Sequence, residues 1–296
     1  MRTKNRNTMS IVGAGRVGSA LAVLFSRAGY NIVSIVSQKK NSARNLARIV
    51  KCQKYSDSLS DIHPTTQIIL LAVPEEYISE IAKAIARNPS LDFPTLAVFH
   101  TSGSLTSDAL LPLMKKGATA FSLHPIQSFS KASKLDHQLV LMKNAVYGFE
   151  GSKTALPAAR RFVTALRGNL VQIPKEEKIL YHCACVFASN YSIAVLGIVD
   201  ALAKRIDGEI NLSHFEPLVR TSIENAFRLT PAAALTGPIV RGSTSTLENH
   251  VNELRKTDTT LALLYQQIGL RALKMAVKRK SIQPHVAGHI RRIFES

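Results

Sequence analysis

Three glycines near the start of the chain, Gly13, Gly15 and Gly18, have the spacing G-x-G-x-x-G. An apolar stretch precedes them and a helical repeat of apolar residues follows, which indicates a strand–turn–helix unit. In such a unit the first glycine permits a tight turn, the second lets the backbone approach a pyrophosphate, and the third lets the helix pack closely on the strand. The helix N-terminus would offer unpaired N–H groups to the phosphates. The motif predicts a dinucleotide site, and its predicted contacts are Gly13, Ala14, Gly15, Arg16, Val17 and Gly18.

The residues after the second predicted strand, Asn31–Val36, indicate which dinucleotide would bind. An acidic side chain at this place would bind the ribose hydroxyls of NAD, but hydroxyl groups and cations stand here instead. A 2′-phosphate is a dianion that accepts charge-assisted hydrogen bonds, so the residues favour NADP. The predicted contacts to that phosphate are Ser37, Lys39, Lys40 and Arg44. The alternative is that these cations only solvate a loop of a basic protein.

Two later turns should also reach the cofactor, because ligands of a doubly wound sheet bind beyond the carboxyl ends of its strands. Ala72, Val73 and Pro74 follow a buried apolar strand, and Val73 and Pro74 should flank the riboses. Ser102 lies in the turn after the next strand, in the segment His100–Ser104. Its small polar side chain suits the surroundings of the nicotinamide or of a substrate carboxylate.

Four side chains could serve a hydride transfer, which needs a proton donor and, for an acidic substrate, a cation that binds it. Lys178 and His182 are four residues apart in a long predicted helix and therefore share a face. His124 precedes Pro125 at a strand end, where it could touch substrate or only fix the turn. Arg241 lies in a Thr-Gly-Pro-Ile-Val-Arg-Gly loop and offers a planar guanidinium to a carboxylate. The alternatives are a solvated lysine, a histidine satisfied between domains, and an arginine in a structural salt bridge.

The order of predicted elements points to an α/β fold. Strands and helices alternate through the first half of the chain, as a doubly wound parallel sheet requires. After Thr154 an Ala-rich helical pattern predominates. The predicted helices are Ala155–Leu166, Lys175–Asp207, Leu218–Leu229 and Thr246–Arg279. We expect a Rossmann dinucleotide-binding domain over residues 1–152 and an all-helical substrate and dimerisation domain over residues 153–296, with the substrate in a cleft between them.

The composition indicates which classes of binding partner the protein could have. The 296 residues include 38 Lys and Arg against 20 Asp and Glu, a formal net charge of +18. The cations are spread along the chain and no aromatic-and-basic strand pattern of the RNA-binding type occurs, so we expect no nucleic-acid partner. We also expect no signal peptide and no apolar run of the ~20 residues that a membrane span needs. Cys52, Cys183 and Cys185 suggest reduced thiols, so we expect a cytoplasmic protein.

Two further features concern metals and assembly. Cys183 and Cys185 have neither the spacing nor the partners of a zinc site, so no metal is expected. The helical half contains long Ala- and Leu-rich stretches, Tyr191–Leu202 and Leu261–Ala276, with more apolar surface than one helical layer covers. These stretches predict a homodimer.

An ordered set of motifs resembles a known family. The motifs are Ile11–Gly18, His100–Ser104, Ser122–Phe129, Tyr181-His182 with Ala188–Tyr191, and Leu235–Gly242 with His250. Together they resemble the Rossmann-like oxidoreductases that carry a C-terminal domain of unknown function 2520. That family is similar in fold to 6-phosphogluconate dehydrogenase, ketopantoate reductase and pyrroline-5-carboxylate reductase. The resemblance implies an NAD(P)-dependent reductase whose helical domain is of the 6-phosphogluconate dehydrogenase type, and it leaves the substrate open.

The resemblance also bears on the proton donor. The β-hydroxyacid dehydrogenases and ketopantoate reductase carry a helical lysine followed four residues later by asparagine, whereas here His182 follows Lys178. His182 could therefore itself donate the proton. We predict an NADP-dependent oxidoreductase that reduces a small acidic substrate, a ketopantoate-like keto acid or an imino acid. The alternatives are a catalytically silent NADP-binding regulator and, on the strength of the basic segment Lys274–Lys280, a nucleic-acid-associated protein.

Overall fold

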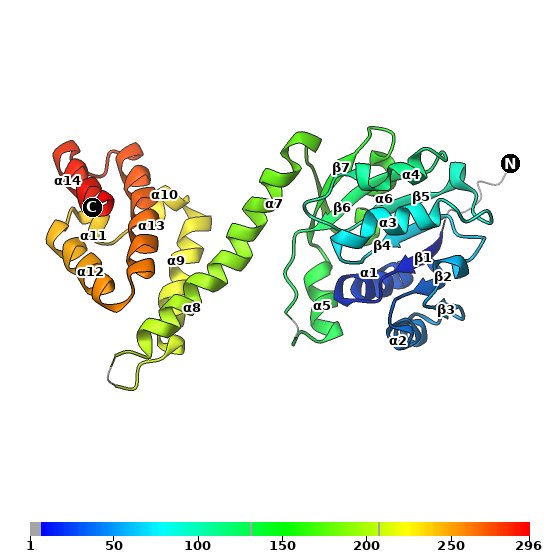
Figure 1. Cartoon of the computed structure of the whole chain (residues 1–296), viewed down its shortest axis with the longest axis horizontal. Helices are drawn as coiled ribbons and strands as arrows, with labels where there is room; N and C mark the ends of the chain where they lie inside the picture. Colours follow the sequence, from blue (N-terminus) through cyan, green and yellow to red (C-terminus); the bar gives the residue numbers. More distant parts are fainter. Residues whose placement is uncertain (1–6, 131, 207) are drawn as a thin grey trace. The chain divides into compact units, whose positions relative to one another are not determined.

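The computed structural model describes residues 7–130, 132–206 and 208–296 (Figure 1). The chain forms two compact units that meet between Ala194 and Val195, within one helix. The first unit contains an eight-stranded sheet, and the regular structure described in the second is helical. The predicted fold class, a Rossmann-type α/β domain followed by a helical one, is confirmed.

The sheet has the strand order β3-β2-β1-β4-β5-β6-β7-β8. Its strands are β1 (Thr8–Val12), β2 (Asn31–Val36), β3 (Tyr55–Ser56), β4 (Ile68–Leu71), β5 (Ala97–His100), β6 (Thr119–Pro125), β7 (Val146–Gly151) and β8 (Asn169–Gln172). The prediction of a wholly parallel sheet needs one correction, because β6 and β7 are antiparallel. β7 begins beside the end of β6, with Tyr147 opposite Pro125. The chain between these two strands therefore leaves and re-enters the sheet at the same end of its strands.

Helices cover both faces of this sheet (Figure 1). Alternate strand residues point to opposite faces, so Ile11 packs in one apolar cluster and its neighbour Val12 in the other. The first face is covered by α1 (Arg16–Arg27), α2 (Lys40–Val50), α5 (Leu135–Met142) and α6 (Leu156–Ala165). The second face is covered by α3 (Glu75–Ile85), α4 (Leu111–Met114) and the 3₁₀ turns Leu59–Asp61, Phe93–Thr95 and Ser107–Leu110.

The sheet continues past residue 152, where we expected the first domain to end. Helix α6 buries Phe162 and Val163 in the same apolar cluster as α1. β8, which the sequence pattern did not predict, then pairs in parallel with β7. β8 was missed because it is only four residues long and mostly exposed, which removes the apolar signal of a buried strand.

A 3₁₀ turn (Lys175–Glu177) opens a long helix that includes α7 (Lys178–Val186), a π-helical turn (Phe187–Tyr191) and α8 (Ser192–Ala203). The prediction extended it to Asp207, which lies outside the described residues. Contrary to our expectation, the stretch Lys175–Ala203 is long and apolar enough for a membrane span by length and composition, with a mean hydropathy of 1.6. None of that window is buried, unlike the core helix of a soluble protein, but a single such helix is weak evidence for a membrane span.

The second unit has its own apolar core, built by α12 (Thr244–Thr257), α13 (Thr259–Lys278) and α14 (Pro284–Glu295). The other helical segments are the 3₁₀ turn Leu212–Phe215, α9 (Glu216–Arg228), α10 (Pro231–Ala234) and α11 (Pro238–Arg241). The predicted single helix Thr246–Arg279 is wrong, because Asp258 interrupts it. The Asp258 backbone is extended, and its carboxylate caps α13 by accepting hydrogen bonds from the N–H groups of Thr260 and Leu261 at 2.8 and 3.1 Å.

Candidate active site

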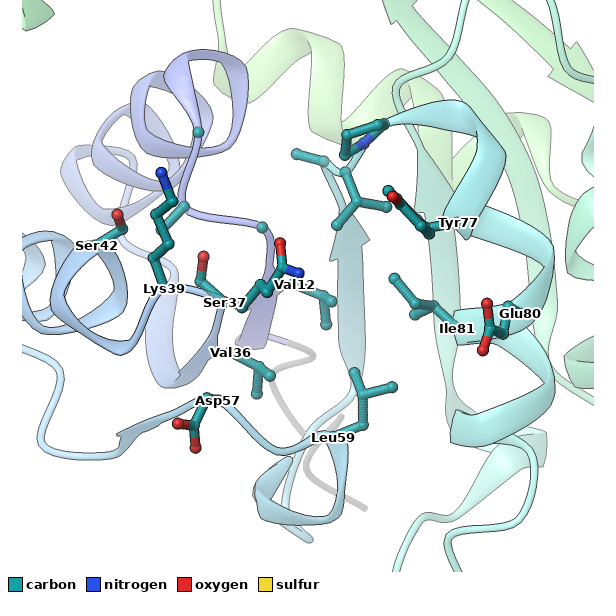
Figure 2. A pocket seen from close by; sticks show the side chains of 17 residues that line it. Val12, Val36, Ser37, Lys39, Ser42, Asp57, Leu59, Tyr77, Glu80 and Ile81 are labelled. Carbon is teal, nitrogen blue, oxygen red and sulfur yellow. The ribbon is translucent and has the colours of Figure 1, made fainter.

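A pocket of about 560 Å³ lies between the ends of β1 and β4, where the strand order of the sheet reverses (Figure 2). This is the place at which doubly wound sheets bind their ligands. Eight residues predicted to bind the cofactor line it: Gly13, Ala14, Gly15, Ser37, Lys39, Ala72, Val73 and Pro74. The remaining lining residues are Val12, Val36, Gln38, Ser42, Asp57, Leu59, Tyr77, Glu80 and Ile81.

The three motif glycines differ in their surroundings as the motif requires. Gly13 has φ +103°, and a Cβ there would clash with the carbonyl of Ala72 at the end of β4. A Cβ on Gly18 would clash with the carbonyl of Gly13, so Gly18 lets α1 start tightly against the turn. A Cβ on Gly15 would meet no atom within 4 Å. Gly15 thus borders open space at the start of α1, and the turn fits a bound pyrophosphate.

The predicted phosphate contacts separate into two groups. Ser37 and Lys39 line the pocket, whereas Lys40 and Arg44 are exposed side chains of α2 outside its lining. Arg16, Val17, Gly18 and Ser102 are likewise absent from the lining. The hydroxyl of Ser102 is engaged elsewhere, since it donates a hydrogen bond to the Glu75 carboxylate at 2.9 Å.

Lys178 is fully buried at the start of α7. Its Nζ donates a hydrogen bond to Ser122 Oγ at 2.7 Å, and that hydroxyl donates to the carbonyl of Ser102 at 3.2 Å. Burial lowers the pKa of Lys178 to about 8, and the nearby carboxylate of Glu150 opposes that shift. Glu150 lies opposite Ser122 in the β6–β7 pair and accepts hydrogen bonds from the backbone and hydroxyl of Ser107.

Two histidines complete this cluster. His124 Nδ1 is hydrogen-bonded to the Tyr181 hydroxyl at 2.7 Å, and the ring of His182 lies edge-on to His124 with centroids 6.1 Å apart. Burial, helped by the charge of Lys178, lowers the pKa of His124 to about 4, so this ring is neutral at pH 7. A Cβ on Gly103 would lie 2.5 Å from His182 Cδ2 and 3.0 Å from His124 Nε2. The turn after β5 therefore packs directly on both rings.

His100 and Glu75 also contact the turn after β5: the N–H of Ser102 donates a hydrogen bond to His100 Nδ1, and its hydroxyl donates one to Glu75. Burial lowers the pKa of His100 to about 4, and its Nε2 is hydrogen-bonded to the Thr106 carbonyl at 3.1 Å. Hydrogen bonds from Ser104 and Ser102 lower the pKa of Glu75. Glu75 directly follows Pro74 of the pocket lining. Hydrogen bonds through Ser122 and Ser102 thus connect Lys178 with Glu75, the residue next to the pocket lining.

A second pocket of about 640 Å³ adjoins the two histidines. His124 and Gln127 line one side, and the other side is formed by His182 with Ser189 and Asn190 of the π-helical turn. Such turns occur frequently at functional sites. Lys178, His124 and His182, three of the four predicted catalytic residues, therefore come together within the first unit.

Two family models match successive parts of the chain. A Rossmann-like domain model matches residues 2–125, and the model of the domain of unknown function 2520 matches residues 145–272. This protein combines a Rossmann-like domain with a domain of unknown function 2520 (DUF2520). The resemblance found in the sequence motifs is thereby confirmed. The specific kinship with ketopantoate and pyrroline-5-carboxylate reductases stays a prediction.

Solved structures agree with this fold. A Bacteroides fragilis protein proposed to be an NADP oxidoreductase is 22% identical, with a TM-score of 0.71 over 90% of this chain and 97% of its own. A protein of Thermotoga maritima is 23% identical, with a TM-score of 0.73 over 92% and 99%. The reductive aminase of Aspergillus terreus, in complex with NADPH and ethyl levulinate, is 15% identical, with a TM-score of 0.64 over 97% and 99%. No curated protein matches the chain.

The DUF2520 match includes β7, β8 and α7, so Lys178 and His182 belong to it while they contact β6 of the Rossmann-like sheet. Sequence reasoning included Ser122 and Tyr181 in its motifs but gave them no role, and it missed Glu150, because these roles depend on strand pairing and helix packing over long separations. Arg241, the fourth predicted catalytic residue, is an exposed side chain at the end of α11 in the second unit. Its predicted contact with a substrate carboxylate stays a prediction.

Proposed function

We propose that this DUF2520 protein is an NADP-dependent oxidoreductase that reduces a small keto or imino acid. The observation that carries the proposal is the fully buried Lys178, linked by hydrogen bonds to the turn beside the dinucleotide pocket. Burying an ammonium group costs free energy, and strongly perturbed pKa values are typical of functional sites. A silent NADP-binding regulator would have no use for such a residue, which favours the enzyme.

The bound dinucleotide would supply a hydride to the carbon of a carbonyl or imine. The substrate oxygen or nitrogen then needs a proton, and Lys178 is suited to donate it. With a pKa of about 8 it is mostly protonated at pH 7, and its burial stabilises the neutral amine left after the transfer. His124 is neutral at that pH and would orient the substrate by hydrogen bonding, together with His182.

The side chains around Lys178 support its role as the proton donor. Ser122 holds the ammonium group through its hydroxyl, and Glu150 favours the charged form from the neighbouring strand. Gly103 keeps the two imidazoles against the turn that leads from the dinucleotide pocket. Among these groups only Lys178 combines a charge at pH 7 with complete burial, and we therefore assign it the role of general acid.

The preference for NADP can be tested at two neighbouring lysines. Lys39→Ala should weaken NADPH binding about tenfold and leave NADH binding unchanged, because Lys39 lines the pocket beside Ser37. Lys40→Ala is the matched control, since Lys40 carries the same charge outside the lining. Nicotinamide fluorescence gives the dissociation constants. Equal affinities for both cofactors, unaltered even in the double variant Lys39→Ala/Lys40→Ala, would contradict the proposed preference.

We also propose that the protein is a homodimer. The helix Lys175–Ala203 carries exposed apolar side chains such as Phe187 and Ile193, and in the second unit Phe227 of α9 is 90% exposed. Such surfaces are covered in soluble proteins, and a second copy offers a matching apolar face. Light scattering in detergent-free buffer should give twice the chain mass of 32.3 kDa. A 32 kDa species at micromolar concentration, or a requirement for detergent, would refute the dimer.

A further inference from the structure

Asp57 is an acidic residue in the lining of the dinucleotide pocket, at a place that the sequence motif does not reveal. β3 pairs with β2, and the carbonyl of Ser56 accepts a hydrogen bond from the Ser37 N–H at 3.0 Å. Asp57 is the next residue, so it leaves the sheet beside the predicted phosphate contacts. Within the described residues its carboxylate, which is exposed, makes neither a hydrogen bond nor an ion pair.

The surroundings of Asp57 differ from those of Lys39. Val36, Leu59 and Ile81 line the same pocket and form apolar walls suited to the faces of a planar base. Figure 2 shows Asp57 at the end of the pocket where Val36 and Leu59 lie, while the ammonium group of Lys39 points away from it. The pocket thus separates a cationic side, suited to a phosphate, from an apolar end that carries an acceptor.

We propose that Asp57 recognises the adenine of the dinucleotide by accepting a hydrogen bond from its 6-amino group. An ionised carboxylate only accepts hydrogen bonds, and the 6-amino group is the donor on the edge of adenine. A carboxylate turned toward the ribose would instead repel a 2′-phosphate and work against Ser37 and Lys39. The inference rests on the proposed NADP-dependent function and assigns the recognition of adenine to Asp57.

The test measures the binding of three probes by nicotinamide fluorescence: NADPH, NADH and the deamino analogue of NADPH, in which a carbonyl replaces the 6-amino group. The unaltered protein should bind NADPH about tenfold or more tightly than the deamino analogue, because a hydrogen bond to a charged group is lost. Asp57→Ala should bind both with nearly equal affinity. Asp57→Asn should accept the analogue, since an amide can also donate.

Glu80→Ala is the matched control, because Glu80 is the other carboxylate of the lining and comes from α3. This variant should keep the preference for NADPH over its deamino analogue. The proposal is overturned if Asp57→Ala keeps that preference, if Glu80→Ala loses it, or if Asp57→Ala only strengthens NADPH binding relative to NADH. Failure of the unaltered protein to bind any of the three probes would refute the proposed function itself, and the adenine contact with it.

Discussion

Gly15→Val is expected to abolish the binding of NADPH and NADH while the protein still folds. The backbone at Gly15 has φ −78° and ψ −172°, a conformation that valine adopts readily. A Cβ at this position meets no protein atom within 4 Å, so the side chain would project into the space required by a pyrophosphate. We expect a loss of at least a hundredfold in affinity for both cofactors, measured by fluorescence titration, with circular dichroism to verify folding.

Gly18→Ala provides the contrasting variant. Its added methyl group would clash with the Gly13 carbonyl, so here the loss should appear first in thermal stability. The two variants therefore distinguish Gly15, whose replacement should affect cofactor binding, from Gly18, whose replacement should affect stability. Binding within a few-fold of the unaltered protein in Gly15→Val would mean that the pyrophosphate does not lie over this turn.

Lys178→Ala should lower turnover by roughly 10²–10⁴, the usual contribution of a positioned general acid. The measurement is NADPH oxidation with a panel of small keto acids and imines, continued with whichever compound the unaltered protein reduces. The Michaelis constant should change less than turnover, because the proton is needed mainly in the transition state. Lys175→Ala is the matched control: Lys175 is exposed and pairs with Asp108 at 2.7 Å, so its removal should leave turnover unchanged.

The same residue sets the expected pH dependence. The pKa of Lys178 is lowered to about 8 by burial, so the proton-donating form is present below that pH and disappears as the pH rises through it. The turnover of the unaltered protein should fall on the alkaline side accordingly. Lys178→Arg should be slow at every pH and lack this limb, because arginine stays protonated. An unchanged alkaline limb in Lys178→Ala would assign the titration to another group.

The sequence predicted the parts of this protein whose signals are local. The turn from Gly13 to Gly18 follows from residue spacing and apolar periodicity, and the structure gives each glycine the expected surroundings. Asp57 could not be found in this way, because it reaches the pocket through the pairing of β2 with a two-residue strand.

The residues of the proposed catalytic cluster also divide into those that the sequence reveals and those that only the structure does. Lys178 and His182 are recognisable from their helical spacing, whereas Ser122 and Glu150 acquire their role only when β6 and β7 pair in antiparallel register. The break at Asp258 was missed for another reason. A helical apolar pattern runs through both α12 and α13, and only the capping hydrogen bonds of Asp258 show that one helix ends there and another begins.

The contact of Gly103 with two imidazole rings has a consequence for the entropy of catalysis. Since even a methyl group at position 103 would clash with His182 and crowd His124, the loop limits how far either ring can turn toward it. Part of the rotational freedom of His124 and His182 would therefore be given up during folding and not when a substrate binds in the proposed site. Preorganisation of this kind lowers the entropic cost of reaching a reactive geometry. A larger residue at position 103 would loosen the rings and slow the reaction without removing any reacting group.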